Sequence, residues 1–162
     1  MEWIKGNLLE ADCNYICQQV NCQGRMASGI AKSIKEKWPI VYTEYMNWCH
    51  YWIDVSFNNG NSPSGSELMH GRIQIVNVDD NQNVINMAAQ LYYGYDGKRY
   101  TSYDAFWSCL GEIRRTVPAG SSIGFPKGIG CGLGGANWEV IETMIYEVLD
   151  DRFRVYIYEL EE

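Results

Sequence analysis

Two glycine-rich segments are the parts of this sequence best suited to holding an anion. Residues 21–31 (NCQGRMASGIA) and 126–135 (PKGIGCGLGG) each follow a short apolar run and precede residues with helical spacing. Small residues let backbone N–H groups approach a ligand closely, and the next helix places about half a positive charge at its N-terminus. The second segment has five glycines in eight residues, which is entropically costly on folding. Both segments therefore indicate places where the backbone meets a phosphate.

Two known glycine-rich nucleotide-binding motifs, the Rossmann fingerprint and the Walker A loop, do not fit this sequence. Gly130, Gly132 and Gly135 match the letters of the dinucleotide fingerprint G-x-G-x-x-G. A Rossmann domain, however, carries that motif after its first strand and continues with further βαβ units, whereas one helix and one strand remain here. No Gly-Lys-Ser/Thr follows, so a Walker A loop is excluded as well. For the first segment, a plain strand-to-helix turn without a ligand stays open.

Length and composition indicate one globular domain. The chain has 162 residues, of which 46% are hydrophobic and 20% are charged. No apolar run approaches the roughly 20 residues that cross a bilayer, and the N-terminus has no signal-peptide pattern. We therefore expect a single domain over residues 1–162, cytoplasmic and without a membrane partner.

The net charge and the spacing of the cysteines limit which ligands, metals and cofactors we expect the chain to bind. A net charge of −7 repels the backbone of duplex nucleic acid, so an anionic ligand would depend on backbone N–H groups. The six cysteines form no C-x-x-C pair, and neither His50 nor His70 is near two of them in sequence. We therefore expect reduced thiols, no metal and no other cofactor. The oligomeric state is left open.

Apolar periodicity alternates between strand and helix. Strands are predicted at 3–5, 15–20, 72–78, 83–89, 122–126 and 154–158, and helices at 30–38, 40–52, 102–117 and 137–149. Ser102 and Asn137 are good N-caps for the last two helices. Residues 58–65 and 90–100 have loop composition. This order predicts an α/β domain whose mixed sheet has helices on both faces.

Several of these motifs, taken in order, resemble a macrodomain. They are residues 5–9 (KGNLL), the segment 21–31, the run 130–133 followed by Trp138, and the closing strand 155–160. The resemblance covers nearly the full chain. It is greatest to the branch that holds the terminal ADP-ribose protein glycohydrolase and the ADP-ribose-1″-phosphate phosphatases, including small phage and bacterial members. It implies a three-layer α/β/α fold with a central mixed sheet, and a cleft that binds ADP-ribose or a derivative.

The resemblance also implies roles for individual residues. Asn7 and Leu8 would lie at the adenine, with asparagine in place of the aspartate that many macrodomains have, and Asn21 and Gln23 would reach the distal ribose. Tyr158 would stack on the adenine, although plain packing at the sheet edge is an alternative. Two runs would wrap the diphosphate: Met26, Ala27, Ser28, Gly29 and Ile30 on one side, and Ile129, Gly130, Cys131, Gly132, Leu133 and Gly134 on the other.

Departures from the family pattern bear on catalysis. The glycohydrolase of this branch uses a lysine and an aspartate, and this chain has Gln90 near the first position and Gly134 at the second. Glutamine cannot form a Schiff base and glycine offers no acid or base, so we do not expect that mechanism. The histidine of the yeast-type phosphatases is also missing, with Gln18 and Gln19 nearest to its place.

A catalytic group is then expected in the first glycine-rich segment or in residues 90–103, the segment that begins with Gln90. Asp96 is the candidate base for activating a water, although Asp96-Gly97 could simply form a turn. Cys131 is near a helix N-terminus, where a thiol pKa can fall, or it fills a tight loop. We favour hydrolysis of ADP-ribose-1″-phosphate. A non-catalytic ADP-ribose binding module and a lysine-independent release of ADP-ribose from protein or nucleic acid stay open.

Overall fold

The computed structural model describes residues 1–161, and a six-stranded sheet forms its centre. The strands are β1 (Glu2–Lys5), β2 (Tyr15–Asn21), β3 (Ile73–Asp79), β4 (Gln82–Gln90), β5 (Ser122–Pro126) and β6 (Arg154–Glu159). Their order across the sheet is β1-β6-β5-β2-β4-β3. β3 and β4 form an antiparallel hairpin, and every other neighbouring pair is parallel. The sheet is therefore mixed, as the sequence predicted.

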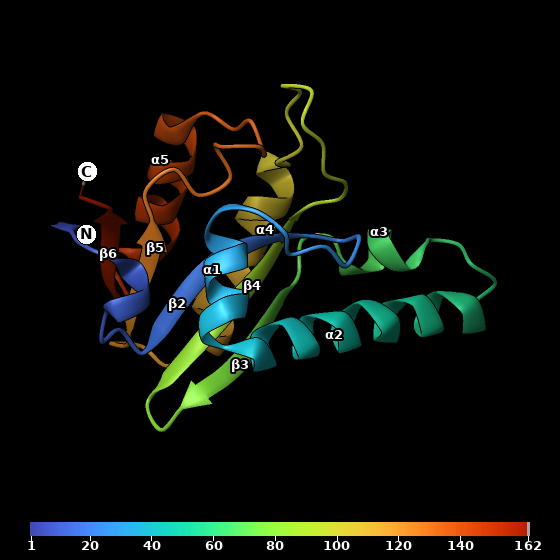
Figure 1. The fold of residues 1–162 in the computed structure, drawn as a ribbon, viewed down its shortest axis with the longest axis horizontal. Helices are drawn as coiled ribbons and strands as arrows, with labels where there is room; N and C mark the ends of the chain where they lie inside the picture. The colour runs from blue at the N-terminus through green and yellow to red at the C-terminus, as the bar shows by residue number, and fades with distance from the viewer. Residues whose placement is uncertain (162) are drawn as a thin grey trace.

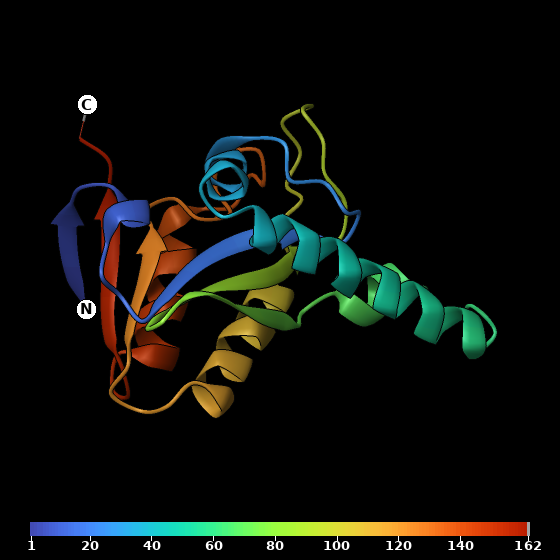
Figure 2. The ribbon, with the colours of Figure 1, turned by 60° about the horizontal axis from the view of Figure 1, so that its bottom comes forward.

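Helices cover both faces of this sheet (Figures 1 and 2). The helices are α1 (Gly29–Lys37), α2 (Pro39–Asn58), α3 (Gly65–Met69), α4 (Tyr103–Thr116) and α5 (Trp138–Leu149), and a 3-10 helix, η1 (Leu8–Glu10), follows β1. α1 and α2 lie on one face, with α3 packed against α2, and α4 and α5 lie on the other. The three-layer α/β/α arrangement confirms the predicted fold class.

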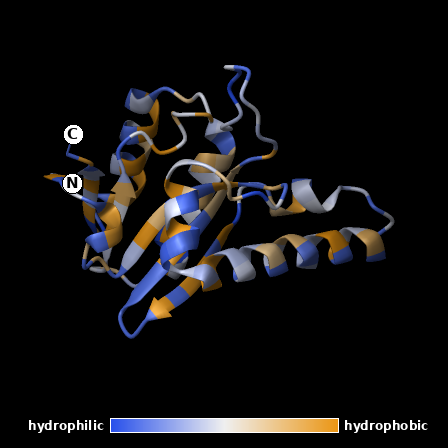
Figure 3. Cartoon of the chain, viewed as in Figure 1, coloured by the Kyte–Doolittle hydropathy of each residue, from blue (hydrophilic) through white to orange (hydrophobic). Residues whose placement is uncertain are grey.

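Strand β4, which lies between β2 and the edge strand β3, faces both cores. Val84 and Ala88 pack toward α1 and α2, whereas Ile85 and Met87 pack toward α4 and α5. All four side chains are fully buried. A strand covered on both faces needs a nearly continuous apolar run, which β4 has. Figure 3 shows the result, with apolar residues recurring along the strands and the turn between β3 and β4 hydrophilic.

One row of amides interrupts the apolar layer beneath α2. Gln18 Nε2 donates to Asn86 Oδ1 (2.7 Å), and Asn86 Nδ2 donates to Gln74 Oε1 (3.0 Å). Gln74 Nε2 then donates to the carbonyl of Glu44 in α2 (2.8 Å). Gln18 and Asn86 are completely buried, and burial of such groups requires hydrogen-bond partners. The side chains of this ladder therefore link β2, β4 and β3 to one another and to the backbone of α2.

Both predicted N-caps are present. Ser102 Oγ accepts from the amide of Ala105 (3.1 Å), and Asn137 Oδ1 accepts from the amide of Glu139 (2.9 Å). Each bond satisfies an amide that the first turn of the helix leaves unpaired, which is why these residues begin α4 and α5. No helix within residues 1–161 is long and apolar enough to span a membrane.

The predictions for residues 40–65 were wrong in two details. α2 continues to Asn58 instead of ending near Trp52, and α3 begins at Gly65, inside the predicted loop. Ser56 Oγ donates to the carbonyl of Pro63 (2.7 Å), and Ser64 caps α3 by accepting from the amide of Glu67. These contacts join the end of α2 to α3.

Two glycine-to-alanine substitutions should change stability in opposite directions. A Cβ at Gly65 would lie 2.8 Å from backbone atoms of Ile53, so Gly65→Ala must separate α3 from α2 and lower the unfolding free energy by about 1–3 kcal/mol. Gly111 is inside α4 and its Cβ would meet only the mobile end of Arg115. Gly111→Ala should therefore raise the unfolding free energy by roughly 0.5–1 kcal/mol. Urea unfolding of both variants checks the signs, and a neutral Gly65→Ala would contradict the packing described here.

Candidate functional site

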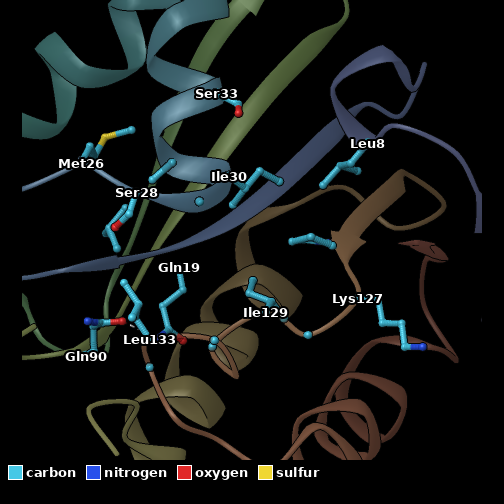
Figure 4. Close-up of a pocket in the computed structure, with 18 of the residues that line it drawn as sticks. Leu8, Gln19, Met26, Ser28, Ile30, Ser33, Gln90, Lys127, Ile129 and Leu133 are labelled. Atoms are coloured by element: carbon cyan, nitrogen blue, oxygen red, sulfur yellow. Dashed lines mark hydrogen bonds between the residues drawn. The ribbon is translucent and has the colours of Figure 1, made fainter. Parts of the chain in front are cut away.

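A cavity of about 820 Å³ opens at the edge of the sheet where β2, β4, β5 and β6 end. The start of η1, the first glycine-rich loop and the start of α1 line one side (Figure 4). The second glycine-rich loop and the segment after β4 line the other. Ligands of open parallel sheets bind at the carboxyl ends of the strands, and this volume is typical of a small-molecule site.

Most of the residues predicted to bind a ligand line this cavity. They are Asn7, Leu8, Asn21, Met26, Ala27, Ser28, Gly29, Ile30, Ile129, Gly130, Gly132, Leu133, Gly134 and Tyr158, together with Gln90. Three predicted residues, Gln23, Cys131 and Asp96, are not among the lining residues. The lining also includes residues that the sequence analysis did not assign to the site, notably Gln19, Arg25, Tyr93, Tyr95, Lys127 and Glu159.

The first loop leaves the N-terminus of α1 open to the cavity. Ser28, the residue before the helix, has extended backbone and makes no side-chain capping bond. Gly29 has a φ of +59°, a left-handed conformation that favours glycine. The amide groups of the first helical turn therefore keep their capacity to donate. An anion in the cavity would meet these amides and the positive end of the helix dipole.

Asn21 and Gln23 serve the structure of this loop. Asn21 Oδ1 accepts from the amide of Gln23 (2.9 Å) and the hydroxyl of Tyr45 (2.9 Å), and Asn21 Nδ2 donates to the carbonyl of Arg25 (2.8 Å). The Gln23 side chain donates to Ser66 Oγ and to the carbonyl of Leu91. Asn21 thus lies at the cavity with its amide engaged in the loop, and Gln23 connects the loop to α3.

The second loop presents unpaired amides. Within the described residues, the N–H groups of Gly130, Gly132, Leu133 and Gly134 donate no hydrogen bond, and all four residues line the cavity. The carbonyl groups of Gly130 and Gly134, in contrast, are hydrogen-bonded. The Gly130 carbonyl accepts from the amide of Ala136, and the Gly134 carbonyl accepts from the amide of Tyr100. Successive N–H groups of this kind make an anion-binding concavity.

Gln19 joins the strand ends below the second loop. Its Nε2 donates to Gln90 Oε1 (2.8 Å) and to Thr101 Oγ1 (2.7 Å). Gln90 Nε2 donates to the carbonyl of Tyr92, and Thr101 Oγ1 donates to the carbonyl of Gly130. Both polar ends of Gln90 are therefore committed to the protein. The place where the resemblance puts a lysine holds a neutral amide network instead.

The second loop has no room for an aspartate after Leu133. A Cβ at Gly134 would lie 2.5 Å from the carbonyl oxygen of Gly130 and 2.5 Å from Thr101 Oγ1. Gly130 has a φ of +76°, and its own Cβ would lie 2.8 Å from Gln19 Oε1. The glycines at 130 and 134 thus permit a backbone packing that a longer side chain would open.

The opposite end of the cavity is apolar with one ion pair. Leu8 is buried and meets Gly124, whose lack of a Cβ makes the space for it, since a Cβ there would lie 2.7 Å from Leu8 Cδ1. Tyr158 lines the cavity beside them, and burial raises the pKa of its phenol to about 12, so the ring stays neutral. Lys127 Nζ and Glu159 Oε1 form an ion pair (3.1 Å) at the rim.

Asp96 and Cys131 lie outside the lining. Asp96 accepts from the hydroxyl of Tyr100 (2.8 Å) and the amide of Lys98 (3.2 Å), and these bonds lower its pKa. Burial raises the pKa of Cys131, the reverse of the lowering that its place near a helix N-terminus suggested. Within residues 1–161, no cluster of three or more His, Cys, Asp or Glu side chains is placed to hold a metal ion.

Cys131 should accordingly react slowly with alkylating agents. The thiolate is the nucleophile, and a raised pKa leaves less of it at neutral pH. At pH 7.5 we expect iodoacetamide to modify Cys131 at least about threefold more slowly than glutathione, and the rate should still be rising above the pKa of an ordinary thiol. Mass spectrometry of the modified peptide measures this rate. Modification faster than glutathione would mean that the helix N-terminus controls the thiol.

Comparisons with known proteins agree on the fold. No family model matches the chain. A "DNA ADP-ribosyl glycohydrolase" from Mycobacterium tuberculosis is 27% identical over 143 residues, which are 86% of this chain and 36% of that protein. The chain therefore spans about a third of the length of this relative.

The solved macrodomain of Mycobacterium tuberculosis DarG superimposes with a TM-score of 0.76 at 22% identity, covering 97% of this chain and 95% of that one. Thermosipho africanus DarTG in complex with ADP-ribose gives a TM-score of 0.73 at 18% identity, covering 97% of this chain and 40% of that one. The six-stranded mixed sheet, the cavity between two glycine-rich loops and these structural neighbours together show that the chain has the macrodomain fold.

Proposed function

We propose that this macrodomain binds ADP-ribose, or a molecule that carries an ADP-ribosyl group, in the cavity between its two glycine-rich loops. The observation that carries the proposal is the set of unpaired amides in residues 130–134, which share the cavity with the uncapped start of α1. Backbone N–H groups on two sides can hold a diphosphate without a field of lysines. This suits a chain with a net charge of −7.

The two ends of the cavity differ in chemistry, and this suggests the orientation of the ligand. The apolar end with Leu8 and Tyr158 suits the adenine, because an aromatic ring and an aliphatic side chain can pack on its faces. The polar end, with Asn21 and Gln90, would then receive the distal ribose. Figure 4 separates these ends, with Leu8 on one side and Gln90 on the other. The solved complex of the Thermosipho protein, which has this fold, supports ADP-ribose as the ligand class.

A charge placed in the second loop should abolish binding. A Cβ at Gly132 would meet no atom within 4 Å, so a side chain can extend from there without disturbing the fold. Gly132→Glu puts a carboxylate beside the amides proposed to hold the diphosphate. We expect the Kd for ADP-ribose, measured by calorimetry, to rise at least about 100-fold, because like charges in a partly desolvated site repel strongly.

Gly132→Gln is the matched control for this substitution, since it has the same bulk without the charge. It should weaken binding much less than Gly132→Glu does. Equal losses in both variants would attribute the effect to bulk, and unchanged binding by Gly132→Glu would remove the second loop from the site.

Hydrolysis of ADP-ribose-1″-phosphate is the second candidate function, and Asp96 is its proposed base. The favouring observation is that Asp96 remains a carboxylate on the same segment as Tyr93 and Tyr95, which line the polar end of the cavity. Asp96 would have to turn from Tyr100 toward the cavity to activate a water. The lysine-dependent release of ADP-ribose receives no support, because a glutamine stands at position 90, with both polar ends hydrogen-bonded to the protein, and Gly134 has no room for an aspartate.

Substitution of Asp96 tests this second function. In a phosphorus NMR time course with ADP-ribose-1″-phosphate, the wild-type protein should release inorganic phosphate and Asp96→Asn should release it at least about 100-fold more slowly. Asparagine keeps an acceptor for Tyr100, so folding and ADP-ribose affinity should be preserved. Asp80→Asn, an exposed change in the turn between β3 and β4, is the control. Equal rates in both variants would exclude Asp96 as the base, and binding without turnover by the wild type would leave a binding module.

A further inference from the structure

Arg25 is an unpaired cation at the polar end of the cavity. Two cationic side chains are among the lining residues, Arg25 and Lys127. Lys127 is paired with Glu159 at the apolar end. Within the part of the chain that the structure describes, no carboxylate lies within 4.0 Å of the Arg25 guanidinium. The polar end thus carries a positive charge that no acidic side chain neutralises, in a chain that is acidic overall.

The position of Arg25 is set by the first loop and by the segment after β4. Asn21 holds its backbone, with Nδ2 donating to the Arg25 carbonyl (2.8 Å) and Oδ1 accepting from the Arg25 amide (3.4 Å). The guanidinium lies 5.2 Å from the centroid of the Tyr93 ring. The phenols of Tyr93 and Tyr95 raise the pKa of Arg25, so both lie near it. Three groups with hydrogen-bond donors therefore meet where the cavity opens.

We propose that Arg25, flanked by Tyr93 and Tyr95, binds a phosphate attached at or beyond C1″ of the distal ribose. The inference rests on the proposed function, because it takes the orientation of ADP-ribose from the two ends of the cavity. The diphosphate of the ligand would lie at the glycine-rich loops, between the ends, so Arg25 is left to a different phosphate. A guanidinium fork matches two phosphate oxygens at once, and a stacked tyrosine keeps it in place.

A phosphate at this position has two possible sources with the same chemistry. One is the terminal phosphate of free ADP-ribose-1″-phosphate. The other is a backbone phosphate of a single strand that carries an ADP-ribosyl group on one of its bases. Tyr93 and Tyr95 are 41% and 64% exposed, so the polar end is open enough for a ligand that continues beyond the ribose.

Calorimetry with three ligands tests the inference: ADP-ribose, ADP-ribose-1″-phosphate, and a short single-stranded oligonucleotide with one ADP-ribosylated base. The wild type should bind at least one of the two phosphate-bearing ligands about 10-fold or more tightly than ADP-ribose, since hydrogen bonds between charged groups are stronger than those between neutral ones. Arg25→Met should remove this preference while changing the Kd for ADP-ribose by less than about threefold. Arg25→Lys, which keeps the charge without the fork, should retain part of it.

Lys127→Met is the matched control, because Lys127 is the cation at the other end of the cavity. It should change the affinity for all three ligands by the same factor and leave the preference intact. The inference is overturned if the wild type binds ADP-ribose and shows no preference, or if the preference survives in Arg25→Met. If the wild type does not bind ADP-ribose at all, the proposed function itself fails. The ligand that shows the preference identifies the source of the phosphate.

Discussion

Residues 100 and 101 hold the second glycine-rich loop in the conformation on which the cavity depends. The amides of Tyr100 and Thr101 both donate to the carbonyl of Gly134, and the Thr101 hydroxyl donates to the carbonyl of Gly130. These bonds use carbonyl groups of the loop, whereas the N–H groups of Gly130, Gly132, Leu133 and Gly134, which line the cavity, donate to no other described residue. The same threonine accepts from Gln19, so the loop is connected to the end of β2 as well. A single polar side chain therefore couples three segments that are distant in sequence.

Much of the fold could be predicted because its signals are local. The alternation of apolar residues identified all six strands, and the strand β5 was predicted with its observed bounds. Ser102 and Asn137 marked the starts of α4 and α5, since an N-cap acts within one turn of its helix. The glycine-rich loops could also be recognised, because small residues between a strand and a helix are visible in the sequence. These loops do line the cavity, while the roles of their residues in binding stay a prediction.

Features that depend on contacts between distant residues could not be predicted. Gln19 bonds to Gln90 and Thr101, which are 71 and 82 residues away, and nothing in the neighbourhood of Gln19 indicates such partners. Arg25 was visible within the first loop, but its proximity to Tyr93 depends on how the segment after β4 folds back. α3 was missed for the same reason, because its stability comes from contact with the end of α2. The direction of the Cys131 pKa depends on burial, which the sequence does not reveal.

The amide ladder beneath α2 has a consequence for how the strands align. A one-residue slip of β4 against β2 would exchange the side chains that β4 directs into the two cores, because side chains alternate along a strand. A two-residue slip preserves the faces, and an apolar row alone would permit it. Such a slip would set Gln18 opposite Val84 or Ala88 and strand its buried amide without a partner, at a cost of about 1–3 kcal/mol. The ladder therefore distinguishes the native alignment from the even-numbered alternatives. It fixes how far the ends of β2 and β4 extend, with Asn21 opposite Gln90, and so brings the Gln90 side chain within hydrogen-bond reach of Gln19 at the cavity.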